Sequence, residues 1–149
     1  MTCMSQRASA AMMAAGVAAM VAAAGLASPA RAQDSVYLGA NIDGRQVPSG
    51  GEDGATADFN AAIDLEKGEI CYYLDVLELP DAEAASINHA KAGESGPAVA
   101  TLPLPQGGDE VCTMVDKAVL AAIAREPAGY YVAVRTPSHP DGAIRGQLN

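Results

Sequence analysis

Apolar and polar residues alternate along two stretches in the middle of the chain, residues 57–65 and 70–77. Alternation with a period of two puts the apolar side chains on one face of an extended segment, as in a half-buried strand. The apolar face of the first stretch consists of Ala57, Phe59, Ala61, Ile63 and Leu65. Residues 66–69, which contain Gly68, separate the two stretches. A short glycine-containing turn between alternating strands predicts a β-hairpin.

Shorter apolar runs predict further strands on both sides of this hairpin. They cover residues 36–40, 86–89, 98–104, 130–136 and 143–148. Pro103 interrupts the third run, and proline suits the edge of a sheet because it has no backbone donor. Residues 137–142, which contain two prolines and a glycine, are expected to form the turn of a closing hairpin.

One segment, residues 117–126, has the period of a helix. Its apolar positions at helical spacing are Val119, Leu120 and Ile123. Asp116 stands where an N-cap is expected, and Pro127 stops the run. Many short strands with frequent turns and a single helix predict an all-β fold. We expect an antiparallel β-sandwich or barrel-like domain with one short helix before the final hairpin.

The N-terminus has the layout of a secretory signal peptide. Arg7 precedes an uncharged, mostly alanine and glycine stretch at residues 10–27, and Ala-Arg-Ala at residues 30–32 matches a signal peptidase site. A transmembrane anchor is the alternative, since eighteen apolar residues can just span a bilayer. Small residues gain little from lipid, so we expect cleavage. The predicted organisation is a signal peptide at residues 1–32 and one domain at residues 33–149, periplasmic or extracellular, without stable membrane insertion.

Removal of the signal leaves seven basic and eighteen acidic residues, a net charge of −11. A chain this acidic is repelled by nucleic acid and by anionic lipid, so both are excluded as expected partners. Its partner is unknown from the sequence. Another extracytoplasmic protein, a cationic patch, a metal ion or a neutral ligand remains open.

Two cysteines remain in the mature chain, Cys71 and Cys112. An even pair in an exported domain predicts a disulfide, because the compartment beyond the membrane is oxidising. Two free thiols are the alternative. A bridge over this separation stabilises the fold by about 4 kcal/mol in the chain-entropy model.

Residues 141–148 read Asp-Gly-Ala-Ile-Arg-Gly-Gln-Leu, with residues 144–147 as the most specific piece. They resemble the closing hairpin of the CHRD (chordin) domain family. The combination of residues 38–40 with residues 46–48 resembles its start, and residues 85–97 resemble its central strand and glycine-rich loop. The resemblance implies a secreted β-sandwich-like domain without an established reaction.

Members of this family often carry three histidines, and the resemblance implies the matching positions in this chain. These positions fall on Ser86, Asn88 and Arg135, and none of them is a histidine in this chain. His89 and His139 are displaced from them, and two histidines do not complete a transition-metal site by themselves. We therefore expect no metal cofactor.

Three residues are candidates for binding: Arg135, Arg145 and His89. Arginine forms bidentate pairs with carboxylates, so an anion-recognition patch is possible if the closing strands pair. A cross-strand salt bridge in an acidic protein is the simpler interpretation of both arginines, and His89 is more often an ordinary loop histidine.

The chain contains no nucleophile elbow, phosphate-binding loop, metalloprotease helix or redox Cys-x-x-Cys motif. The sequence therefore favours a non-catalytic binding or structural module over an enzyme. A metal-binding or redox protein of the periplasm is the alternative.

The exported protein is expected to begin at Gln33, because Ala-Arg-Ala at residues 30–32 directs cleavage there. N-terminal sequencing of the protein from an exported fraction measures this. An intact N-terminus in a membrane fraction would instead establish the anchor.

Overall fold

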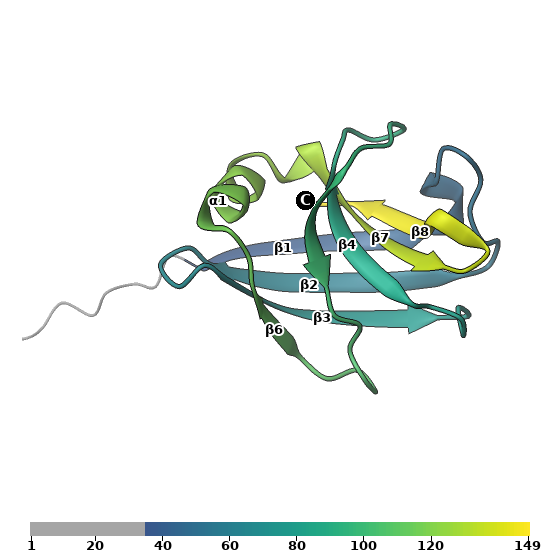
Figure 1. Cartoon of the computed structure of the whole chain (residues 1–149), viewed down its shortest axis with the longest axis horizontal. Helices are drawn as coiled ribbons and strands as arrows, with labels where there is room; N and C mark the ends of the chain where they lie inside the picture. Colours follow the sequence, from purple (N-terminus) through teal and green to yellow (C-terminus); the bar gives the residue numbers. More distant parts are fainter. Residues whose placement is uncertain (1–34) are drawn as a thin grey trace, which may run out of the picture. The chain divides into compact units, whose positions relative to one another are not determined.

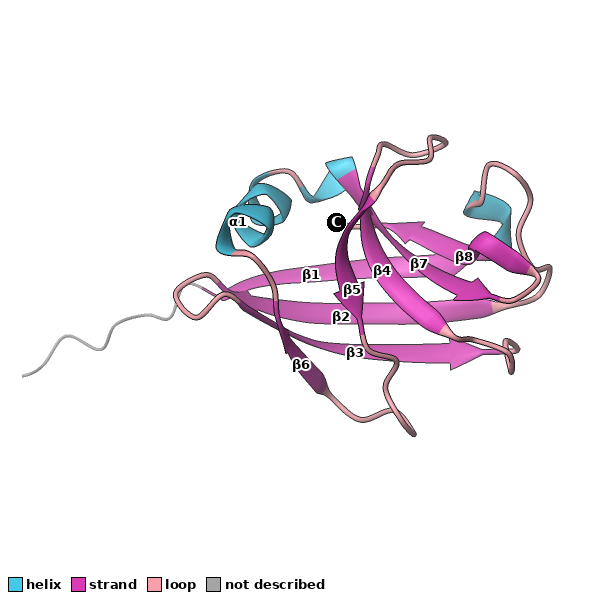
Figure 2. Ribbon diagram, viewed as in Figure 1, coloured by secondary structure: helices cyan, strands magenta, loops and turns pink. Residues whose placement is uncertain are grey.

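The computed structural model describes residues 35–149, and the predicted signal peptide at residues 1–32 lies outside the described residues. Strands dominate the domain (Figures 1 and 2). The strands and the helix are β1 (Ser35–Asp43), β2 (Thr56–Asp64), β3 (Glu69–Leu77), β4 (Ala84–His89), β5 (Ala98–Leu102), β6 (Val111–Met114), α1 (Lys117–Arg125), β7 (Tyr130–Thr136) and β8 (His139–Gln147). Among these residues, no helix has the length and apolar character needed to cross a bilayer.

All eight strands form one antiparallel sheet with the order β5-β4-β7-β8-β1-β2-β3-β6. The sheet curls until it is nearly closed, and α1 lies beside one end of the long strands (Figure 2). This architecture confirms the predicted all-β, antiparallel, barrel-like fold with one short helix before the final hairpin.

The β2–β3 hairpin forms as its alternation predicts. Its strands pair without interruption from Thr56 opposite Leu77 to Asp64 opposite Glu69. Gly68 adopts a φ of 76° in the turn, a conformation that glycine reaches without steric cost. Every second residue is buried in the barrel, from Ala57 to Ile63 on β2 and from Ile70 to Leu74 on β3, which is why the alternation is regular.

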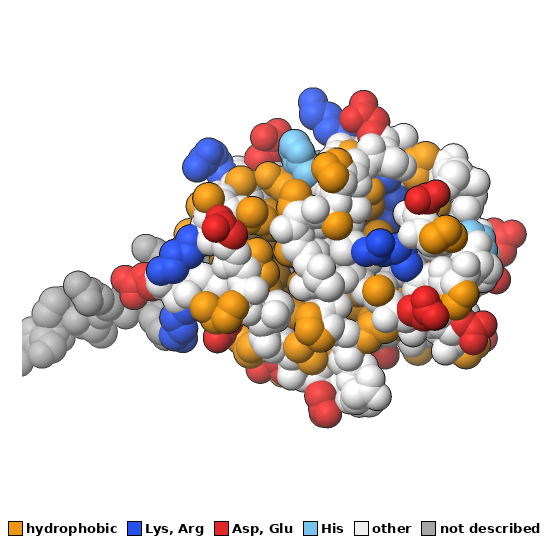
Figure 3. Space-filling view, in the orientation of Figure 1, with side chains coloured by type: hydrophobic (Ala, Val, Ile, Leu, Met, Phe, Trp, Pro, Cys, Tyr) orange, Lys and Arg blue, Asp and Glu red, His pale blue; other side chains and the backbone are white. Residues whose placement is uncertain are grey.

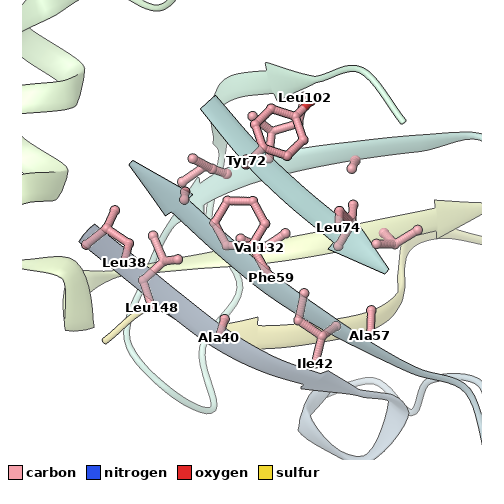
Figure 4. Close-up of a cluster of buried hydrophobic side chains, with 14 of the residues drawn as sticks. Leu38, Ala40, Ile42, Ala57, Phe59, Tyr72, Leu74, Leu102, Val132 and Leu148 are labelled. Atoms are coloured by element: carbon pink, nitrogen blue, oxygen red, sulfur yellow. The ribbon is translucent and has the colours of Figure 1, made fainter. Parts of the chain in front are cut away.

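The barrel interior is filled by aliphatic side chains around one aromatic pair (Figure 4). The rings of Phe59 and Tyr72 lie with centroids 5.6 Å apart, within the range of favourable aromatic pairs. The fully buried aliphatic residues include Ile42, Ile63, Ile70, Ile87, Leu102, Val132, Ile144 and Leu148. The core therefore draws on strands from the whole sheet.

Helix α1 begins where the sequence predicts and ends one residue earlier, at Arg125. The Asp116 carboxylate accepts hydrogen bonds from the backbone N–H groups of Ala118 and Val119, at 2.8 and 3.3 Å, which caps the first turn. Leu120 and Ile123 are completely buried, so the apolar stripe of the helix packs on the domain.

Cys71 and Cys112 form a disulfide, as predicted. They face each other in the register of β3 and β6, with Cα atoms 4.0 Å apart. The sequence did not predict β6, because its four residues are alternately half-buried and exposed and give no apolar pattern. The disulfide therefore joins this short edge strand to the sheet.

The closing hairpin differs from the prediction in the length of its turn. Residues 137–142 were expected to form a turn, but β8 begins at His139, so only Pro137 and Ser138 connect the last two strands. The register between β7 and β8 shifts after Val134. With this shift, His139 at the start of β8 pairs with Thr136 of β7, although apolar and polar residues do not alternate there.

Tyr72 links two parts of the sheet that are far apart in strand order. It lies on β3, next to the edge strand β6, and its hydroxyl donates to the carbonyl of Pro103, which follows the other edge strand β5. Tyr72 is completely buried, and this burial raises its pKa to about 12. The bond thus stabilises the approach of the two sheet edges.

We expect the stabilising effect of the Tyr72 hydroxyl to disappear at high pH. Between its ordinary pKa of 10.0 and its folded pKa of about 12, the unfolded chain releases the phenolic proton while the folded chain keeps it, so the free energy of unfolding falls. At neutral pH, Tyr72→Phe should be less stable than the parent by about 1 kcal/mol, and this difference should shrink as the pH rises above about 10. Urea unfolding of both proteins across that range measures it, and a constant difference would contradict the assignment.

Candidate functional site

Period-two alternation places several polar residues on the outer face of the barrel wall formed by β4, β7 and β8. Ser86 and Asn88 lie on this face of β4, opposite Ala133 and Tyr131 of β7. Arg135 lies two residues beyond Ala133 and therefore on the same face. Figure 3 shows basic side chains over β4 and β7 on the side in view.

Arg145 lies on the same face of β8 and contacts no carboxylate within 4.0 Å among residues 35–149. The expected cross-strand salt bridge is therefore wrong for this residue. Its guanidinium donates to the carbonyls of Lys91 and Glu94 and to the side-chain oxygen of Gln147. It also stacks 3.6 Å from the centre of the Tyr131 ring. Neutral acceptors and an aromatic face replace the expected acid.

These contacts fix the loop of residues 90–97 against the sheet. Arg145 is only 3% exposed, and its burial lowers its pKa from the ordinary value. Gln147 extends the same role, because its amide donates to the carbonyls of Ala90 and Ala128, at 2.8 and 2.7 Å. Arg145 and Gln147 therefore hold one wall of the outer face in place.

The loop meets the sheet most closely at Gly96. Its backbone N–H donates to the Tyr131 hydroxyl at 3.2 Å. A Cβ atom at this position would lie 1.9 Å from the carbonyl oxygen of His89, so any larger residue would push the loop outward. Gly96 thus permits a close approach of the loop to the sheet, and the hydrogen bond to Tyr131 stabilises it.

A pocket of about 300 Å³ lies between this loop and the outer face of β4 and β7. Its lining consists of Ser49, Ser86, Asn88, Ser95, Gly96, Ala98, Tyr131, Ala133, Arg135, Pro140 and Asp141. The volume is at the lower end of the range for small-molecule sites. Arg135 is the one cation in this lining, and Asp141 is the one acid.

A chain of hydrogen bonds orders the floor of the pocket. Arg135 Nη2 donates to Ser86 Oγ at 3.4 Å, and the Ser86 hydroxyl donates to Asn88 Oδ1 at 2.7 Å. Asn88 Nδ2 donates in turn to the carbonyl of Gly96 at 2.9 Å. These hydrogen bonds give Ser86 and Asn88 their partners, and they run from Arg135 to the loop of residues 90–97.

Arg135 Nε is buried and has no hydrogen-bond partner among the described residues. Arg135 also has no carboxylate within 4.0 Å in residues 35–149, so the expected salt bridge is wrong here as well. An unsatisfied buried donor costs about 1–3 kcal/mol.

The structure brings together the three positions at which the resemblance places histidines in relatives. Ser86, Asn88 and Arg135 all line the pocket. The sequence identified these positions one by one, and only the pairing of β4 with β7 shows that they form a single site. Tyr131 and Asp141 were missed as pocket residues, because their contribution depends on the loop and on the shortened turn.

The third candidate, His89, lies outside the pocket at the end of β4. It is exposed and its ring lies 4.8 Å from the ring of Tyr130, which is an ordinary surface contact. His139 Nδ1 is 3.6 Å from a Glu52 carboxylate oxygen. Neither histidine joins the pocket lining.

Within residues 35–149, one cluster contains potential metal ligands. Side-chain atoms of Glu69, Cys71 and Cys112 lie within 4.8 Å of one another. The two sulfur atoms are bonded to each other, and a thiolate rather than a disulfide is the usual metal ligand. In the oxidised protein this cluster serves the fold.

Arg145→Ala is expected to lower the free energy of unfolding by about 1–3 kcal/mol, because two loop carbonyls lose a charged donor. Arg145→Lys should lose a similar amount, since an ammonium cannot reproduce the planar stack on Tyr131. Chemical unfolding checks both variants, with exposed Arg125→Ala as the control for loss of one charge. Unchanged stability in both Arg145 variants would contradict a role for this arginine in fixing the loop.

The family model of the CHRD domain matches residues 38–148. No curated protein and no solved structure matches the chain. The match extends from β1 through the closing hairpin and so covers the barrel, the helix and the pocket. The chain therefore belongs to the CHRD domain family.

Proposed function

We propose that this protein is an exported, non-catalytic binding domain whose ligand site is the pocket at Arg135. Membership of the CHRD family supports a binding or structural module without enzymatic activity. The fold adds a rigid barrel wall on which the pocket is built.

The pocket is the observation that carries the proposal. It measures about 300 Å³, and polar groups from β4, β7 and the loop of residues 90–97 line it. Its one cation, Arg135, has no carboxylate within 4.0 Å among residues 35–149. A ligand acceptor at this guanidinium would receive a charge-assisted hydrogen bond.

The arrangement of Ser86 supports binding rather than catalysis. Its hydroxyl donates to the Asn88 amide and receives a hydrogen bond from Arg135, so no base draws its proton away. Among residues 35–149, no hydrogen bond joins a serine to a histidine or a carboxylate. An activated serine nucleophile requires such a base.

Export is supported by two independent features. The N-terminal sequence has the layout of a cleavable signal peptide. The disulfide between Cys71 and Cys112 is of the kind that persists in an oxidising compartment.

The test is a ¹H–¹⁵N NMR titration of the exported form with a concentrated small-molecule extract of its own compartment. We expect saturable shifts of the amides of Ser86, Asn88 and Tyr131 in the parent. Arg135→Ala should lose these shifts, whereas Arg125→Ala, which removes a charge on the exposed side of α1, should keep them. An extract that leaves all pocket amides unchanged would contradict a ligand site here.

A further inference from the structure

We infer that residues 73–77 of β3 form a docking site at which an extended, basic segment of another protein adds to the sheet as a strand. The hollow beside these residues shares no lining residue with the Arg135 pocket. The inference therefore goes beyond the proposed function and is tested independently of it.

β3 is longer than the strand that covers its outer edge. It pairs with β2 over all nine of its residues, whereas β6 pairs only with Glu69 to Tyr72. Figure 1 shows β6 along only one end of β3. Within residues 35–149, residues 73–77 therefore have a strand on one side and an open edge on the other.

The backbone groups on this open edge belong to Leu74 and Val76. The N–H of Val115 donates to the carbonyl of Gly68, just before β3, at 3.0 Å and in line with the β3–β6 register. Backbone groups of successive strand residues point to opposite sides, so those of every second residue after Gly68 point toward the side of β6. Leu74 and Val76 thus present N–H and C=O groups beyond the end of β6, as a template for an added strand.

A hollow of about 590 Å³ runs along this edge. Four consecutive residues of β3, 73–76, line it, although their side chains alternate between the two faces of the sheet. A space that touches both sets lies at the edge of the strand and not over one face. β2 fills the other side of β3, and residues 104–108 form the opposite wall of the hollow. The hollow thus lies where a strand in line with β6 would run.

The segments that contribute this lining, residues 73–83 and 103–110, are acidic. Their six exposed acids are Asp75, Glu78, Asp81, Glu83, Asp109 and Glu110. The two segments contain no lysine, arginine or histidine. None of the six acids lies within 4.0 Å of a basic group among residues 35–149. A segment with lysine or arginine therefore complements the charge of this edge.

The same charge opposes a second copy of this chain as the occupant. Two copies that paired antiparallel through Leu74 and Val76 would be related by a two-fold axis at Asp75, which lies midway between these residues. Asp75 would then face the second copy's Asp75, and like charges directly opposite each other destabilise strand pairing. The edge is thus protected against self-association and favours a basic strand.

The hollow also determines which side chains the added strand needs. Leu74 is buried and Val76 is half-buried on the near side, and Leu104 and Pro105 lie on the opposite wall. An added strand directs alternate side chains into the hollow and away from it. The matching segment therefore alternates apolar residues, which face the hollow, with basic residues on the face of Asp75.

The test adds a capped peptide, Lys-Val-Lys-Val-Lys-Val-Lys, to the exported form and follows it by ¹H–¹⁵N NMR. We expect saturable shifts of the amides of residues 73–77. Hydrogen exchange of the Leu74 and Val76 amides should slow, because these N–H groups gain a strand partner. Added salt should weaken the binding, since it screens charges at an exposed edge.

Two control peptides separate charge from pattern. Glu-Val-Glu-Val-Glu-Val-Glu keeps the alternation with the opposite charge, and Lys-Lys-Lys-Lys-Val-Val-Val keeps the composition without the alternation. Both should bind at least about tenfold more weakly than the alternating basic peptide.

Two matched variants assign the attraction to this edge. Asp75→Lys should weaken binding of the basic peptide at least about tenfold, because like charges then meet. Glu126→Lys makes the same change of charge at an exposed position after α1 and should bind the peptide like the parent.

The outcomes that overturn the inference are distinct. Binding without slower exchange at Leu74 and Val76 would overturn strand addition, and equal binding of the acidic peptide or full binding by Asp75→Lys would overturn the basic partner. No change with any peptide would overturn the docking site. Sedimentation of the protein alone adds one more outcome, since a dimer with slowed exchange at both amides would make a second copy the occupant. None of these readouts uses the amides of the Arg135 pocket, so the proposed function is decided separately.

Discussion

Arg145 carries a full positive charge to a position that is only 3% exposed, and the contacts that keep it there organise one wall of the barrel. Burying a cation is costly unless its donors are used, and here two loop carbonyls, a side-chain amide and the Tyr131 ring use them. Because its main partners are backbone oxygens, the arginine specifies the path of the loop without requiring a particular side chain in it. The pocket depends on this arrangement, since the loop is its outer wall.

The pocket shows how the fold joins side chains that are distant in the sequence. Ser86 and Asn88 come from β4 and Arg135 from β7, and the pairing of these strands places them on one face. Hydrogen bonds connect them, from the guanidinium to Ser86 and from Ser86 to Asn88. At the positions where the resemblance places histidines in relatives, this chain carries a set of side chains that does not suit a transition metal, because a guanidinium has no acceptor.

The sequence predicts the parts of this molecule that depend on local pattern. The β2–β3 hairpin follows from alternation, and α1 follows from helical spacing with a cap at Asp116. The strand β6 could not be predicted in this way, because its position is fixed by pairing with β3 and by Cys112. The loop partners of Arg145 were missed for a related reason: Lys91 and Glu94 lie more than fifty residues away and contribute main-chain carbonyls, which have no sequence signature. The pocket likewise requires knowledge that β4 and β7 are neighbours.

The two ends of the sheet have a consequence for how copies of the protein meet one another. An exposed edge strand can pair with the edge of another molecule and so start aggregation. β6 has four residues and β5 has five, and Pro103 ends β5, so both edges are short. If β6 detached, the nine-residue β3 would become the edge and offer a much longer template for strand addition. The disulfide opposes this detachment, so the same bond that stabilises the single molecule also keeps the edge of β3 covered at residues 69–72.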